Sequence, residues 1–279
     1  MKYQKFRPCN LLQPFVECYF VWDSEELIAE TLVLESPPSG FCSIVINNGD
    51  EYFLQNKKYE HLHVPKRFIA GQSIYTYKLF LKGKISSTGI VLKPTALSSL
   101  FQLPAFEYTE ERISLDKVFA KSLIEPLSDK IQQATSGNEK VKHLEEFVLF
   151  NYQKNKPQLD FVDFAANMIV EKNGMINVSD ILKDVFMSKR NFERCFLKKV
   201  GLSPKFYARI RRMSYLANLI AGKKKVDWKN LFLQCEFYDQ SHFIKDFIEF
   251  TGRSPQQYLK ENAVLANFVE KPSTNNIHY

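Results

Sequence analysis

The sequence predicts an α+β protein. A β-rich, barrel- or sandwich-like N-terminal domain with some helices is followed by an all-α domain of two helix-turn-helix units joined by a long helix. Three observations support this prediction. Short β-branched and aromatic runs, separated by turn residues, fill the first ninety positions. From about residue 157 the apolar residues recur at helical spacing, and one fragment of that part occurs twice.

The N-terminal strands are expected at six short runs, and many short strands at this spacing are typical of a barrel or sandwich. The runs are 15–22, 41–46, 51–54, 67–70, 75–81 and 87–92. The segment Asn47-Asn48-Gly49-Asp50 between two of them predicts a tight hairpin. Their aromatic residues either line an apolar effector pocket or form a plain core, and strand spacing favours the core.

Helices are expected next. Pro94 precedes a helical stretch at 95–103, and two further helices at 121–154 are separated around residues 135–138. In the second of these, an apolar stripe indicates packing within the domain, with some role in dimerisation left open. The stripe consists of Val141, Leu144, Phe147 and Val148.

These patterns divide the chain into four parts. We expect a β-rich domain over residues 1–120 and a helical linker or dimerisation segment over 121–156. An all-α domain is expected over 157–262 and a flexible tail over 263–279.

Charge is placed unevenly along the chain. The net charge is +7 overall, but residues 1–156 hold 19 Lys and Arg against 18 Asp and Glu, whereas residues 157–279 hold 19 against 13. Positive charge attracts phosphate, so the C-terminal part is the candidate nucleic-acid surface. The sequence has no stretch of about 20 apolar residues and no leader-like start, so we expect a soluble, cytoplasmic protein without a membrane partner.

Metal and cofactor motifs are missing from the sequence. The five cysteines are scattered and form no CxxC pair, which argues against a disulfide framework or a structural zinc site. His61 and His63 would share one face of a strand, but no third and fourth ligand accompany them. We therefore expect no cofactor, no metal and no catalytic residue.

The repeated fragment starts at Asn191 and again at His242, an offset of 51 residues. Each copy has two phenylalanines four apart, a glycine five later, Ser-Pro two beyond it and then a tyrosine. A duplicated unit on a basic segment is how a helical protein places two similar elements along one duplex.

In the first unit, Ser179 is expected to cap a short helix over 180–185, and Ser188 a second helix that runs to about Lys199. Phe192, Cys195, Phe196 and Val200 would form the buried face of that second helix. The opposite face carries the candidate DNA-reading residues, because Arg can bind guanine and Glu can accept from cytosine. They are Lys189, Arg190, Glu193 and Arg194.

In the second unit, Asp227 is expected to cap a helix over 228–235, and Asp239 a helix that runs to Phe250. Three phenylalanines face inward, and a polar set faces outward, in which Gln suits adenine and Lys suits phosphate. The outward set is Gln240, Ser241, His242 and Lys245. Gly201 and Gly252 would end the two reading helices, and the Ser-Pro pairs would start the next ones.

A long helix over 205–221 is expected to join the units and to fix one reading helix relative to the other. It bears Arg209, Arg211 and Arg212 and ends near Lys223-Lys224-Lys225. Those lysines either stabilise the C-terminus of the helix or contact phosphate. The outward residues of the two units differ, so the two units should read different bases in an asymmetric DNA site.

Residues 157–262 closely resemble the DNA-binding domain of the AraC/XylS family of bacterial transcription regulators. The most diagnostic piece is Phe237-Tyr238-Asp239-Gln240-Ser241-His242-Phe243, followed by Phe247, Phe250-Thr251-Gly252 and Ser254-Pro255. The resemblance implies a base-reading face on Arg190, Glu193 and Arg194 in one unit, and on Gln240, Ser241 and Lys245 in the other.

Two features qualify this resemblance. The family usually has glycine in the turn of each unit, where this chain has Phe186 and Glu236. Such a residue is tolerated only where φ is not strongly positive or where strain is accepted.

Residues near 89–115 resemble an N-terminal domain often joined to such readers, which implies an effector-binding or dimerising module.

The sequence thus predicts a DNA-binding transcription regulator whose partner is double-stranded promoter DNA. Contact with RNA polymerase, a small-molecule effector and a homodimer are left open. Two other classes also remain: a DNA-repair or other enzyme that uses an AraC-like reader, and a binding module that has lost DNA recognition through its altered turns.

Overall fold

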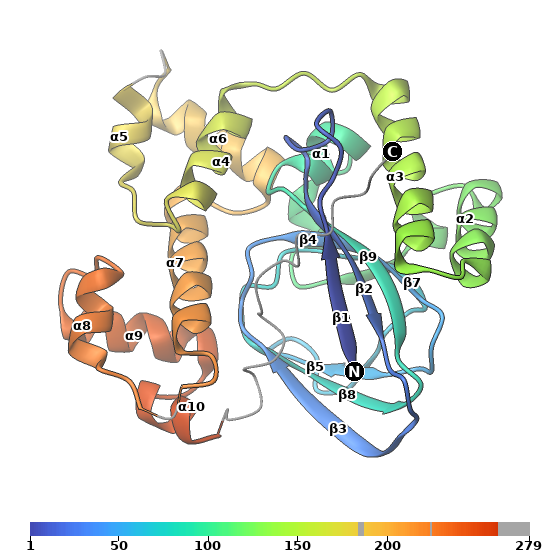
Figure 1. The fold of residues 1–279 in the computed structure, drawn as a ribbon. Coiled ribbons are helices and arrows are strands. Elements are labelled where there is room, and N and C mark those ends of the chain that lie inside the picture. The colour runs from blue at the N-terminus through green and yellow to red at the C-terminus, as the bar shows by residue number, and fades with distance from the viewer. Residues whose placement is uncertain (184–186, 224, 262–279) are drawn as a thin grey trace.

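A computed structural model describes residues 1–183, 187–223 and 225–261. The expected α+β architecture is confirmed: two antiparallel sheets and three helices form the N-terminal part, and the remainder is helical (Figure 1). The C-terminal helices lie along one side of the β-region, and α2 and α3 lie on the other side (Figure 1). The expected tail at 263–279 lies outside the described residues.

The larger sheet has the strand order β1-β2-β9-β4-β7-β10, and all its pairs are antiparallel. Its strands are β1 (Lys2–Phe6), β2 (Val16–Asp23), β4 (Cys42–Asn47), β7 (Arg67–Ala70), β9 (Ser86–Leu92) and β10 (Arg112–Ser114). The smaller sheet has the order β3-β8-β5-β6. It comprises β3 (Ile28–Ser36), β5 (Phe53–Gln55), β6 (Leu62–His63) and β8 (Tyr77–Gly83).

The strand β4 shows how the two sheets are layered. Ile44 and Ile46 point into the core beneath the helices, whereas Val45 joins a second core with residues of the smaller sheet. Both faces of β4 are buried, which explains its continuous apolar run. The larger sheet is therefore the middle layer, with the smaller sheet on one face and helices on the other.

The expected hairpin at Asn47–Asp50 is wrong. β4 pairs with β7 and β9, whereas β5 pairs with β6 and β8, so this segment carries the chain from one sheet to the other. The backbone N–H groups of Asn48 and Asp50 donate instead to the carbonyls of Ser86, the first residue of β9, and of Lys84, just before it. The sequence indicates a turn in this segment, but the backbone groups to which the segment bonds lie much further along the chain.

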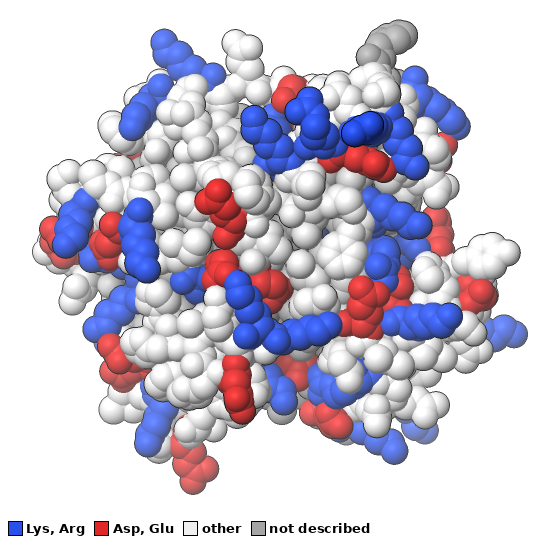
Figure 2. Space-filling model, turned by 180° about the vertical axis from the view of Figure 1, so that it is seen from behind, with Lys and Arg blue, Asp and Glu red and all other residues white. Residues whose placement is uncertain are grey.

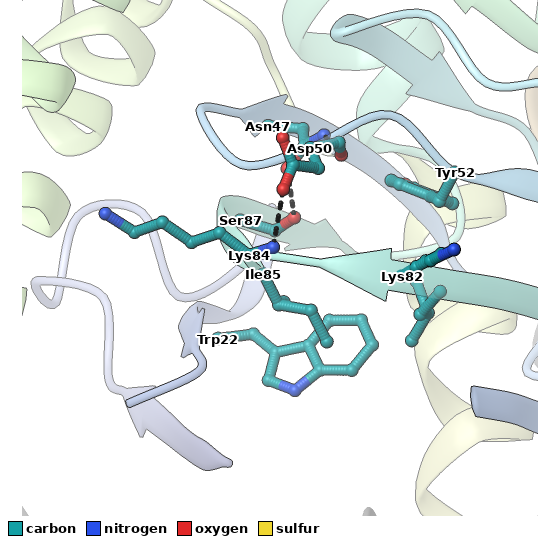
Figure 3. A pocket seen from close by; sticks show the side chains of 9 residues that line it. Trp22, Asn47, Asp50, Tyr52, Lys82, Lys84, Ile85 and Ser87 are labelled. Carbon is teal, nitrogen blue, oxygen red and sulfur yellow. Dashed lines mark hydrogen bonds between the residues drawn. The ribbon is translucent and has the colours of Figure 1, made fainter. Parts of the chain in front are cut away.

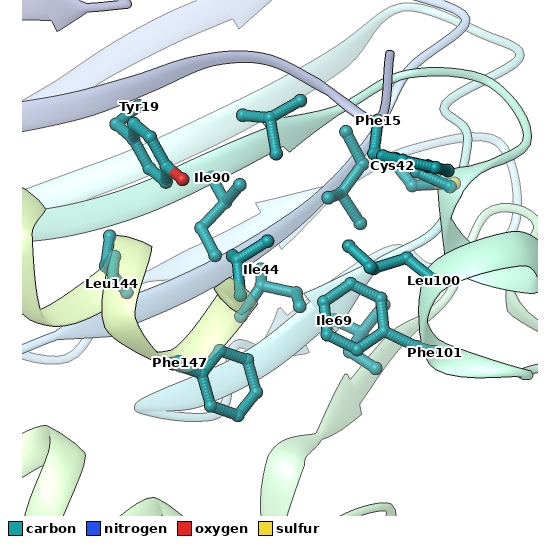
Figure 4. Packing of buried hydrophobic residues seen from close by; sticks show 14 of the residues in the cluster. Phe15, Tyr19, Cys42, Ile44, Ile69, Ile90, Leu100, Phe101, Leu144 and Phe147 are labelled. Carbon is teal, nitrogen blue, oxygen red and sulfur yellow. The ribbon is translucent and has the colours of Figure 1, made fainter. Parts of the chain in front are cut away.

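The main N-terminal core lies between the larger sheet and the helices α1 (Ala96–Phe101), α2 (Lys121–Gln133) and α3 (Gly137–Asn155) (Figure 4). The whole apolar stripe of α3 is buried there, so packing within the chain accounts for it. Two short 3₁₀ helices, η1 (Ala105–Tyr108) and η2 (Leu115–Lys117), complete this part. The expected break between α2 and α3 is confirmed.

The helical part has its own core, which contains six buried phenylalanines among its aliphatic residues. Its helices are α4 (Phe161–Glu171), α5 (Val178–Lys183), α6 (Lys189–Val200), α7 (Pro204–Ile220), α8 (Trp228–Gln234), α9 (Gln240–Thr251) and α10 (Pro255–Glu261). The helix α7 runs between the pairs α5–α6 and α8–α9 (Figure 1). No helix in the described part of the chain is long and apolar enough to cross a bilayer.

Candidate nucleic-acid interface

The first unit consists of α5 and α6. Ser188 caps α6, because its Oγ accepts from the backbone N–H of Asn191. The expected cap at Ser179 is wrong, since α5 begins at Val178 and its first backbone bonds go to the carbonyl of Asn177. The expected end of this helix at residue 185 and the turn residue Phe186 lie outside the described residues.

The helix α6 has one buried and one exposed face, as expected. Phe192, Phe196 and Val200 are fully buried, and Cys195 is half-buried. Lys189, Arg190, Glu193 and Arg194 are exposed. The Arg194 guanidinium donates to Asn191 Oδ1 at 2.9 Å, and Lys189 Nζ lies 4.0 Å from Glu193 Oε1. Both are surface contacts within one helix, which are weak and easily exchanged for a nucleic-acid partner.

The second unit consists of α8 and α9, each capped by the expected aspartate. Asp227 accepts from the N–H of Asn230, and Asp239 accepts from the N–H of His242. The turn between them contains Glu236 at a φ of +52°, in the left-handed region that glycine usually occupies. This residue therefore accepts backbone strain, at a cost of about 1–2 kcal/mol.

The helix α9 buries Phe243, Phe247 and Phe250. Gln240, Ser241 and Lys245 are exposed. His242 is different: it is half-buried, its ring meets Phe237 edge-on at 5.7 Å, and Nε2 lies 3.7 Å from Asp246 Oδ1. The candidate residues thus form two separate groups, one on each reading helix.

The two reading helices end in the same way. Gly201 and Gly252 have φ values of +87° and +74° and stop α6 and α9 in the left-handed conformation. Ser203 then caps α7, with Pro204 at its first position, and Ser254 bonds to Gln257 at the start of α10. The repeated residues therefore build the scaffold, as the sequence predicts.

The arginines of α7 serve the protein itself. Arg209 binds Asp246 of α9 in a bidentate pair, at 2.7 and 3.2 Å, and also contacts Glu249. Arg212 donates to the carbonyls of Gly174 and Glu236. Asp246 is only 3% exposed, so this ion pair fixes α9 against α7. This ion pair was not predicted from the sequence, although an aspartate on the apolar face of α9 indicates a buried partner.

A second buried carboxylate holds α6. Asp163 of α4 is fully buried and accepts from Thr95 at 2.5 Å, Ser99 at 3.0 Å and Lys199 at 2.5 Å. Burial favours the neutral acid, but the backbone N–H of Asp160, the Lys199 ammonium and the Thr95 hydroxyl together keep the pKa of Asp163 below its ordinary value. Because Thr95 and Ser99 belong to the α1 region, this cluster joins α6 to the N-terminal part.

Basic side chains do not gather into one block on the face seen in Figure 2, where Asp and Glu lie among them. Of the lysine cluster after α7, Lys223 and Lys225 are exposed, and Lys224 lies outside the described residues. The charge on this face therefore does not identify a DNA-reading surface, and the candidate interface is defined by the geometry of α6 and α9.

The β-region contains a small pocket lined by Trp22, Tyr52, Leu81 and Ile85 together with polar residues of two turns (Figure 3). The Lys84 N–H donates to Asp50 at 2.6 Å, and the Ser87 hydroxyl donates to Asn47 at 3.1 Å across its rim. Its empty volume of about 230 Å³ includes space that is open to solvent. The expected core aromatics Phe15 and Tyr19 are packed in the main core, away from this pocket.

Metal-binding groups are few. Within residues 1–183, 187–223 and 225–261, no three His, Cys, Asp or Glu side chains gather where they could hold a metal. His61 and His63 both contact the ring of Phe53, at 4.0 and 5.4 Å between ring centroids. His63 also meets Glu51 at 3.0 Å.

Comparison with known proteins gives two family matches. Residues 4–114 match a domain of unknown function (DUF6597), and residues 181–261 match a helix-turn-helix domain. No curated protein matches the chain.

Among solved structures, ToxT from Vibrio cholerae O395 is 12% identical, with a TM-score of 0.46 over 88% of this chain and 98% of that one. ToxT of strain SCE256 with a bound unsaturated fatty acid is 15% identical, with a TM-score of 0.43 over 86% and 94%.

Proposed function

We propose that this chain is a DNA-binding transcription regulator of the AraC type, which reads an asymmetric double-stranded DNA site with α6 and α9. The observation that supports the proposal most directly is the matched pair of reading helices. Both are capped in the same way, both end at a left-handed glycine, and each exposes a different polar set. Phosphate contacts position such helices, and base contacts give them specificity.

The connecting helix supports simultaneous reading by the two units. α7 has 17 residues and is therefore about 25 Å long. A continuous helix of this length keeps the two units apart, as reading of successive major grooves on one face of a duplex requires. We assign base reading to Arg190, Glu193 and Arg194 on α6, with Lys189 beside them. On α9 we assign it to Gln240, Ser241 and Lys245, with His242 at the edge of the surface.

The proposal is tested by selecting binding sites from random double-stranded DNA with the full chain. Substitution of Arg194 by Ala should cost about 1–3 kcal/mol on the selected site and relax the preference at one position. Lys245→Ala should weaken binding and lower the dependence on salt by about one phosphate contact. Lys142→Ala, an exposed lysine on α3, is the control. Unchanged affinity in both variants would refute these assignments.

We infer that the chain acts by binding and not by catalysis. A repair enzyme would need a reactive thiolate, but burial raises the pKa of Cys18 and Cys235 to about 11 and that of Cys42 to about 12. These thiols are therefore protonated and weakly nucleophilic near neutral pH. Titration of the native protein with a thiol reagent tests this, since one rapidly reacting cysteine would restore the enzyme hypothesis.

We propose that the N-terminal domain regulates DNA binding. We place the start of the DNA-binding domain at residue 157. The many contacts between α6, α7, α9 and the β-region support this proposal. A small-molecule effector, contact with RNA polymerase and a homodimer remain open. Sedimentation of the protein with and without its selected DNA would give the number of copies bound.

A further inference from the structure

One short segment of the N-terminal part contacts the ends of both reading helices. We call residues 72–76, between β7 and β8, the clamp segment. The Gln72 side-chain Nε2 donates to the carbonyl of Val200, the last residue of α6, at 2.9 Å. The backbone N–H of Thr76 donates to the carbonyl of Phe250, in the last turn of α9, also at 2.9 Å.

These two carbonyls belong to the group that a helix leaves without an internal partner at its C-terminus. In each reading helix the N-terminal part supplies that missing donor. Between the two bonds, Ile74 and Tyr75 pack against the phenylalanine-rich core of the helical part. Four of the five residues of the clamp segment therefore contact the helical part.

Glu110 holds the clamp segment in place. It is 8% exposed and has a φ of +63°. Its Oε1 accepts from the backbone N–H groups of Ile74 and Tyr75, and its own N–H donates to the carbonyl of Gln72 at 3.0 Å. Its Oε2 accepts from Asn56 Nδ2 at 2.8 Å. The buried carboxylate of Glu110 thus ties two residues of the segment to the β-region, and its backbone N–H ties a third.

α7 joins the readers within the helical part, where the Arg209–Asp246 ion pair also fixes α9 against it. Asp163 and Lys199 tie α6 to the N-terminal part. The clamp segment is a further link across the domain boundary, and it contacts the C-terminal ends of both α6 and α9.

We propose that the clamp segment, positioned by Glu110, sets the spacing and mutual rotation of α6 and α9, so that the N-terminal domain determines which half-site spacing is read. This inference rests on the proposed function. Glu110 and Gln72 are positioning residues that act through the reading helices and make no contact with DNA.

The test uses the full chain, its selected DNA site, and two altered sites with one base pair inserted or deleted between the half-sites. Each change rotates one half-site by about 35° relative to the other. The wild-type protein should bind the altered sites at least about tenfold more weakly than the selected site. Glu110→Ala should reduce this difference to less than about threefold, because its readers can adjust.

Three further variants make the result specific. Glu110→Gln keeps an acceptor for Ile74 and Tyr75 and should restore discrimination. Gln72→Ala removes only the bond to α6 and should lose part of the discrimination between the selected and altered sites. This variant tests the proposal if Glu110→Ala does not fold. Glu111→Ala, the neighbouring residue, binds Lys58 and Tyr59 through its side chain and should discriminate like wild type.

The outcomes separate the two proposals. A wild-type protein that binds no double-stranded DNA site would refute the proposed function. A wild-type protein that binds but tolerates altered spacing, or a folded Glu110→Ala variant that discriminates as wild type does, would overturn the clamp and leave the proposed function intact. Amide exchange at Thr76 gives an independent reading, since the clamp predicts faster exchange in Glu110→Ala and unchanged exchange in Glu111→Ala.

Discussion

The two glycines that end the reading helices are required for different reasons. Gly201 and Gly252 share the left-handed conformation, but their surroundings differ. A Cβ added at Gly252 would meet nothing within 4 Å, whereas one added at Gly201 would lie 2.9 Å from the carbonyl oxygen of Ala105. Gly252 is therefore needed for its backbone, and Gly201 both for its backbone and for contact with η1.

This difference predicts unequal losses of stability. Gly252→Ala should lower the free energy of unfolding by about 1 kcal/mol, the cost of a left-handed alanine. Gly201→Ala should cost at least about 1 kcal/mol more, because the contact with residue 105 must also open. Urea unfolding of the two variants measures both values. Equal losses would contradict close packing of α6 against η1.

Asp163 gives a prediction for pH. Its folded pKa lies below the ordinary value, so the carboxylate contributes stability above about pH 4 that is lost as the pH falls through the folded pKa. Asp163→Asn should lower the free energy of unfolding by about 3 kcal/mol at pH 7, since Lys199 loses its buried partner. The difference from wild type should shrink below about pH 4.

The control for this prediction is Asp180→Asn. Asp180 is an exposed residue whose pKa is lowered by Lys183. Its substitution should hardly change stability at either pH, because the pair is screened by solvent. A constant difference between Asp163→Asn and wild type from pH 7 to pH 3 would refute the role assigned to the carboxylate.

Among the elements, α7 shows most clearly how basic side chains stabilise the protein itself. Its arginines lie on a helix of a DNA-binding domain, yet they bind groups of the protein: Arg209 meets Asp246 of α9, and Arg211 donates to the carbonyl of Ser39. Arg211 also lies over the ring of Phe41, 4.3 Å from its centroid. The helix is thus a structural axis whose cations orient the second reader and the β-region.

Arg209→Ala should therefore weaken DNA binding without removing a DNA contact. It leaves Asp246 buried without its cation, which costs about 3 kcal/mol of stability and loosens α9. The affinity for the half-site read by α9 should fall more than that for the half-site read by α6. Lys205→Ala, an exposed cation on the same helix, should change neither. Equal effects on both half-sites would argue against this role.

In the whole molecule, the helical part is docked on the β-region through buried polar contacts. The hydroxyl of Tyr207, a fully buried residue of α7, donates to the carbonyl of Gly40 at 2.9 Å. Arg253 binds Glu35 at another point of the same boundary. Such contacts couple the two parts, so we expect one cooperative unfolding transition.

Tyr207→Phe tests this coupling. It leaves the Gly40 carbonyl buried without that donor and should lower the free energy of unfolding by about 1–3 kcal/mol. Tyr215→Phe is the matched control, because the Tyr215 hydroxyl accepts a long bond of 3.5 Å from the exposed side chain of Gln234. Calorimetry of both variants gives the comparison. Two separate transitions in the wild-type protein would contradict tight docking.

Local features were predictable because the residues that cause them are close together in the sequence. The caps at Ser188, Asp227 and Asp239 and the stops at Gly201 and Gly252 are all present. The cap at Ser179 was wrong because Asn177 supplies the first carbonyl of α5 two residues earlier. The edge strand β3 was missed because much of it is exposed and lacks a buried run.

The sequence by itself determined the class of the protein, since duplicated caps, phenylalanines and glycines identify two helix-turn-helix units from local spacing. Only the tertiary structure decided how those units are held. The pairing of β4, the ion pair of Arg209 with Asp246 and the clamp segment join residues far apart in the chain. Such contacts depend on how the layers pack, and no periodicity along the sequence records them.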